Sequence, residues 1–126
     1  MKIAALIARI LLGVIFLVFG LNGFFHFIPQ GAPPTGLAGQ FMDVLMASHY
    51  AAFVFLLQVL CGFLFLVGLY VPLALTLIAP VIVNILLFHV LMNPAGILPG
   101  AVATLLWIIV FCRVRAAFSG IFLKRA

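Results

Sequence analysis

Five side chains with an amide group or an imidazole ring lie inside the long apolar stretches of this 126-residue chain: Asn22, His26, Gln58, Asn84 and His89. A polar group in an apolar environment needs a partner, and histidine changes its charge near neutral pH. An ionisable residue inside a membrane span is therefore a candidate functional residue by default. These residue types predict a ligand-binding pocket formed by the five side chains.

Composition places these residues in a membrane protein, because 69% of the chain is hydrophobic and only 6% is charged. A soluble domain with this composition would expose too much apolar surface to water. About 20 apolar residues cross a bilayer as a helix. We therefore expect one all-α membrane domain over residues 1–126, a bundle of four transmembrane helices at about 3–28, 51–70, 72–92 and 97–118.

The basic residues predict the orientation of the four helices. Lys2 and Arg9 lie at the start of the first helix, and the other four lie at or after the end of the fourth: Arg113, Arg115, Lys124 and Arg125. Positive charge concentrates on cytoplasmic flanks, so both termini are expected in the cytoplasm. The formal charge of +5 is thus a topology signal, and no basic stripe with interleaved aromatics points to nucleic acid.

The outer loop, residues 29–50, begins with prolines and glycines and becomes amphipathic from Leu37 onward. This pattern predicts a short interfacial helix that partly covers the outer end of the bundle. The same loop carries Asp43, the only acidic residue, and His49. Both are expected at the rim of the pocket.

Helix geometry gives the five pocket candidates a common depth, within about 12 Å of the outer helix ends. Asn22 and His26 are four residues apart and would share a helix face. Asn84 and His89 are five apart, about 140° around a helix, so we expect Asn84 rather than His89 to face the common centre. The alternative is that the three amides only join helices by hydrogen bonds.

Other chemistry finds little support in the sequence. His26, His49 and His89 lack metal-ligand spacing, so no metal site is expected. The two cysteines, Cys61 and Cys112, form no C-x-x-C pair and should lie at different depths. No self-contained catalytic constellation is present, and an enzymatic role would be at most that of an accessory subunit of an oxidoreductase.

Three segments resemble the DoxX family in order along the chain: residues 9–26 (RILLGVIFLVFGLNGFFH), 58–72 (QVLCGFLFLVGLYVP) and 79–89 (APVIVNILLFH). The resemblance implies a four-helix protein of the bacterial inner membrane. It also implies a link to thiosulfate:quinone oxidoreductase, where a DoxX-like chain is a small subunit, and to membrane redox complexes. The family pattern has Lys after the Gly-Leu-Asn stretch, where this chain has Gly23, which counts against an anionic-ligand role there.

We therefore expect a membrane component that binds a quinone-like or lipid-like molecule or supports a redox partner. Quinone is the one cofactor that the resemblance suggests, and membrane lipid and a redox protein are the expected partners. Two alternatives stay open: a structural subunit that packs into a larger membrane complex, and a small transporter. The sequence also leaves a homo-oligomer open.

Overall fold

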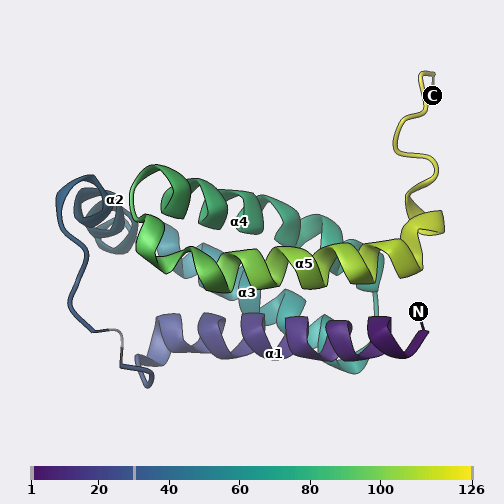
Figure 1. The fold of residues 1–126 in the computed structure, drawn as a ribbon, viewed down its shortest axis with the longest axis horizontal. Coiled ribbons are helices and arrows are strands. Elements are labelled where there is room, and N and C mark those ends of the chain that lie inside the picture. Colours follow the sequence, from purple (N-terminus) through teal and green to yellow (C-terminus); the bar gives the residue numbers. More distant parts are fainter. Residues whose placement is uncertain (1, 30, 126) are drawn as a thin grey trace.

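A computed structural model describes residues 2–29 and 31–125, and within them four long apolar helices form a bundle (Figure 1). These helices are α1 (Lys2–Phe25), α3 (Tyr50–Val67), α4 (Val71–Leu91) and α5 (Ile97–Val114). Short 3-10 turns precede and follow α5, η1 at Pro94–Gly96 and η2 at Arg115–Phe118. Each long helix, with its flanking turns for α5, is apolar enough to cross a membrane. The predicted four-helix membrane fold is confirmed.

The bundle has two chemically different ends. Helix α1 begins and α5 ends at the same end, which we call the terminal end (Figure 1). At the opposite end, which we call the loop end, the short helix α2 (Gly36–Ala47) lies across the bundle (Figure 1). The start of α1 and the end of α5 therefore lie at the same end of the bundle, whereas the placement of both termini in the cytoplasm stays a prediction.

Helices α1 and α3 pack with their backbones in close approach at glycines. A Cβ atom on Gly62 would lie 2.4 Å from the backbone nitrogen of Leu17, and one on Gly13 would lie 3.0 Å from the carbonyl oxygen of Gly62. Lipid provides no hydrophobic drive for helix association, so dense packing of this kind must supply it. The centre of the bundle is filled by the completely buried side chains of Leu12, Cys61, Phe65, Leu75, Ile78 and Val110.

The turn between α3 and α4 is tied to α1 by an arginine. Gly68 ends α3 with φ of +74°, a left-handed conformation that favours glycine, and α4 begins three residues later. The Arg9 guanidinium of α1 donates a hydrogen bond to the carbonyl oxygen of Phe65 in the last turn of α3. A cation at a helix C-terminus satisfies free carbonyls and interacts favourably with the helix dipole. Arg9 therefore has a structural role besides its topology signal.

Helix α2 confirms the predicted interfacial helix, which was expected from Leu37 onward. Ala38 is its buried residue. The ring of Phe41 contacts that of Phe88 near the end of α4, with a centroid separation of 5.6 Å. This aromatic contact holds α2 against the loop end of the bundle.

We predict that Gly62→Ala destabilises the bundle by about 1–3 kcal/mol, because the added methyl group would push the α1 backbone away from α3. Unfolding in mixed detergent micelles, followed by circular dichroism, measures the change. Gly120→Ala is the matched control, since nothing lies within 4 Å of the position that its Cβ would take. Equal stability of the two variants would contradict the packing described for α1 and α3.

Candidate functional site

The five predicted pocket residues differ widely in burial. Asn22 and Gln58 are buried, with 6% and 7% of their surface exposed. His89 is half-buried, and His26 and Asn84 are exposed. The structure therefore places two of the five in the interior of the bundle, one beside its loop end and two on its outside. Ligand binding by any of them stays a prediction.

Asn22 ends helix α1 and turns the chain away from it. The backbone carbonyl of Asn22 accepts a hydrogen bond from the His26 N–H at 2.8 Å, and its side-chain Oδ1 accepts one from the Ile28 N–H at 2.7 Å. His26 follows the last helical residue, Phe25, and has a left-handed φ of +52°. The expected common helix face of Asn22 and His26 was wrong, because α1 stops one residue before His26.

Gln58 lies on the inner side of α3 and is the most buried amide after Asn22. Its side chain makes no hydrogen bond with the other described residues, although a glutamine amide has two donors and an acceptor. No completely covered side-chain nitrogen or oxygen in the described part of the chain lacks a partner, so the Gln58 amide keeps a small accessible surface. Gln58 is thus a buried polar group that makes no side-chain hydrogen bond within the described part of the chain.

The structure reverses the predicted directions of Asn84 and His89, since Asn84 was expected to face the centre of the bundle. Asn84 lies on the exposed face of α4, and its Nδ2 donates a hydrogen bond to the Pro80 carbonyl one turn back, at 2.8 Å. His89 is half-buried; its Nδ1 lies 3.0 Å from the carbonyl oxygen of Asn93, and its ring packs edge-on against Phe88. The two side chains differ in direction as expected, but His89 rather than Asn84 points to the loop-end turn.

The predicted rim residues, Asp43 on α2 and His49 at the start of α3, are both exposed at the loop end. His49 has a left-handed φ of +63° and precedes α3 as its N-cap. Among the described residues, no three histidine, cysteine or carboxylate side chains lie close enough to hold a metal ion. Cys61 is buried and Cys112 is exposed, and both are free thiols.

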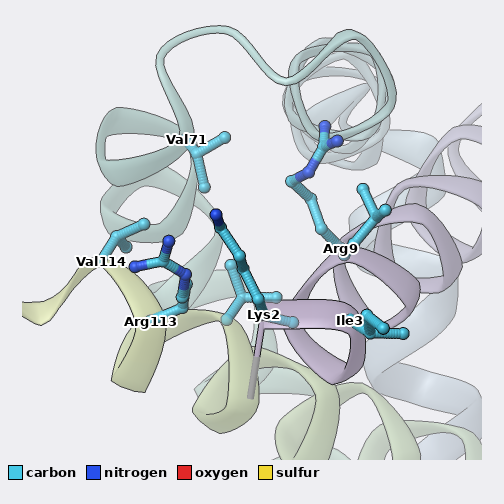
Figure 2. Close-up of a pocket in the computed structure, with 9 residues that line it drawn as sticks. Lys2, Ile3, Arg9, Val71, Arg113 and Val114 are labelled. Carbon is cyan, nitrogen blue, oxygen red and sulfur yellow. The ribbon is translucent and has the colours of Figure 1, made fainter.

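The sequence interpretation did not find a cavity at the terminal end. Lys2, Arg9 and Arg113 line it, together with apolar residues of α1, α4 and α5 (Figure 2). From the sequence, these cations predicted only the orientation of the helices. Arg9 was the residue that could have indicated the cavity, because it lies two turns inside the first apolar helix rather than on its flank.

We predict that Asn22→Ala and Asn84→Ala differ in stability. The first leaves the Ile28 N–H without its acceptor and should cost about 1–2 kcal/mol, whereas the second removes an exposed amide and should change stability by less than about 0.5 kcal/mol. Unfolding in mixed micelles compares the two. A larger loss for Asn84→Ala would contradict the exposed placement of that residue.

Comparison with known proteins gives one match. The family model for DoxX matches residues 4–90, from the first turn of α1 nearly to the end of α4, which leaves α5 outside the match. No curated protein and no solved structure matches the chain. Because the matched segment covers more than half of the 126 residues and the four apolar helices fit a membrane protein of this kind, the chain belongs to the DoxX family.

Proposed function

We propose that this protein binds a small amphiphilic molecule, quinone-like or lipid-like, inside its bundle and acts as an accessory component of a membrane redox system. The observation that carries the proposal is the buried amide of Gln58, which makes no hydrogen bond with the other residues that the structure describes. The redox role comes from the resemblance of residues 9–26, 58–72 and 79–89 to DoxX proteins. The bacterial inner membrane, with both termini in the cytoplasm, is part of the same proposal and is supported by the distribution of Lys and Arg.

The chemistry of Gln58 favours a ligand that carries a carbonyl or ester oxygen. Gln58 is 7% exposed, and a ligand oxygen that accepts a hydrogen bond from its side-chain N–H would give this amide a partner inside the bundle. Asn22 adds a second buried amide, whose Oδ1 is engaged with the Ile28 N–H. A quinone carbonyl oxygen could accept hydrogen bonds from the amide N–H groups of Gln58 and Asn22, and the apolar helix surfaces suit a quinone tail.

The covering of the loop end supports the same proposal. Helix α2 lies across this end, and the contact between Phe41 and Phe88 fixes it there. His89 follows Phe88 in the sequence, is half-buried, and packs edge-on against the Phe88 ring. A ligand at Gln58 would thus be partly screened from water by α2.

The exposed face of α4 favours a second candidate function, that of a structural subunit. Thr76, Pro80 and Asn84 recur at intervals of four residues on this face and are all exposed. Thr76 and Asn84 each donate a side-chain hydrogen bond to a backbone carbonyl one turn back. The other amide atom of Asn84, the acceptor Oδ1, would find no hydrogen-bond donor in lipid. A neighbouring membrane protein that donates to Asn84 would satisfy it.

We predict that Gln58→Leu weakens binding of a short-chain benzoquinone analogue at least tenfold, or about 1.4 kcal/mol. Leucine has a similar size and no polar atoms, so the variant should keep the fold in this apolar interior. Native mass spectrometry of the detergent-purified protein measures the bound fraction and also reports copurifying molecules.

Gln40→Leu is the control, because Gln40 is an exposed glutamine on α2. It should bind the quinone analogue as the natural chain does. Absence of binding to the natural chain, or the same affinity in Gln58→Leu, would remove the ligand proposal. Recovery of a stoichiometric protein partner that is lost in Asn84→Leu would favour the structural subunit instead.

A further inference from the structure

The terminal end of the bundle contains a cavity of about 560 Å³, bounded by the start of α1, the start of α4 and the end of α5. Its walls are largely apolar, and buried Val71 and Val110 are among them. Three cationic side chains line the same space: Lys2, Arg9 and Arg113. The cavity thus combines apolar walls with three positive charges.

Lys2 and Arg113 come from different helices and converge on this cavity. Figure 2 shows both side chains extending toward Val71, Lys2 from the start of α1 and Arg113 from the end of α5. A second cavity, of about 370 Å³, is also lined by these two residues and adds Arg115. Lys2 and Arg113 thus belong to both cavities, and a ligand held between them would contact cations on several sides.

This chain has no acidic side chain with which to neutralise these cations. Its only carboxylate side chain is Asp43, which lies on α2 at the loop end. Like charges that share a cavity with apolar walls repel one another more strongly than they would in open water. An anion from outside the chain would relieve this repulsion.

Arg9 has a different place in the cluster. Its guanidinium donates to the Phe65 carbonyl oxygen and lies against Gly68, where an added Cβ atom would be 2.6 Å from Nη1. This bond uses one of five guanidinium N–H donors. Arg9 is therefore a fixed positive group at the back of the cavity, while Lys2 and Arg113 are exposed and able to adjust to a ligand.

We infer that this cationic cavity binds a phosphate group, supplied by the headgroup of an anionic phospholipid. Phosphate offers several acceptor oxygens, which match guanidinium and ammonium donors from three sides. Basic pockets between transmembrane helices at the cytoplasmic side are suited to such headgroups. Ile3 and Leu6 also line the cavity and are 73% and 47% exposed, which provides an apolar surface for an acyl chain.

The orientation signal alone does not account for the cavity. Lys124 and Arg125 belong to the same basic terminal group, yet neither lines either cavity. A topology signal requires only that the charges lie on one side of the membrane. The convergence of Lys2 and Arg113 on one cavity is the additional feature. Comparing the pair Lys2 and Arg113 with the pair Lys124 and Arg125 therefore distinguishes headgroup binding in the cavity from general attraction to a charged surface.

The test compares two double variants that each remove two positive charges, Lys2→Gln with Arg113→Gln and Lys124→Gln with Arg125→Gln. The natural chain and both variants are equilibrated with an equimolar mixture of phosphatidylglycerol and phosphatidylcholine of identical acyl chains. Native mass spectrometry counts the lipids retained. We expect one phosphatidylglycerol on the natural chain and on the Lys124 and Arg125 variant, and at least a tenfold lower occupancy on the Lys2 and Arg113 variant.

Equal retention of the two lipids by the natural chain would overturn the inference. Equal loss in both double variants would also overturn it, because it would show attraction by overall charge. Arg113→Lys keeps the positive charge and should retain the lipid. The thermal unfolding midpoints of this variant and of the two double variants test whether each keeps the fold.

A second arm separates the source of the phosphate. Inorganic phosphate at millimolar concentration should not displace phosphatidylglycerol if the acyl chain contributes to binding. Displacement that depends on Lys2 and Arg113 would overturn the lipid assignment in favour of a soluble phosphate ligand of the same cavity. Gln40→Leu, an exposed position on α2 at the loop end, should leave lipid retention unchanged.

Discussion

The close approach of α1 and α3 at Gly13 and Gly62 is the contact on which the rest of the bundle depends. In lipid, dense packing replaces the hydrophobic effect as the force that joins helices. With α3 held against α1, Arg9 reaches the last turn of α3, and the short left-handed turn at Gly68 then sets α4 beside α3. Helix α5 closes the bundle through the indole N–H of Trp107, which donates to the Leu75 carbonyl of α4 at 3.0 Å.

A second constraint is that lipid offers no hydrogen-bond partners to exposed polar groups. Thr76, Asn84 and Thr104 each donate to the carbonyl oxygen four residues earlier in their own helix. This local solution leaves helix packing free of those side chains. Gln58 has no such bond and is nevertheless buried, which is why it stands apart from the other polar residues of the spans.

Much of the fold could be predicted from the sequence, because apolar length and charge asymmetry act over whole segments. The spans, the shared side of the termini and helix α2 follow from such patterns. The directions of single side chains depend on local events that periodicity does not contain. Helix α1 stops at Phe25 because Asn22 binds the chain beyond it, and this moves His26 off the helix. The packing of α4 against α3 and α5 likewise decides which of Asn84 and His89 faces outward.

The cationic cavity shows why one set of residues can carry two kinds of information. Lys2 and Arg113 are far apart in the sequence, so their meaning there is limited to the side of the membrane on which each lies. The antiparallel bundle brings the start of α1 and the end of α5 to one place, and the orientation signal becomes a local concentration of charge. With Asp43 at the other end, that charge can be balanced by an anion of the membrane but not by the side chains of this protein. The scarcity of acidic residues is thus the physical reason why the counter-ion proposed for this cavity comes from lipid.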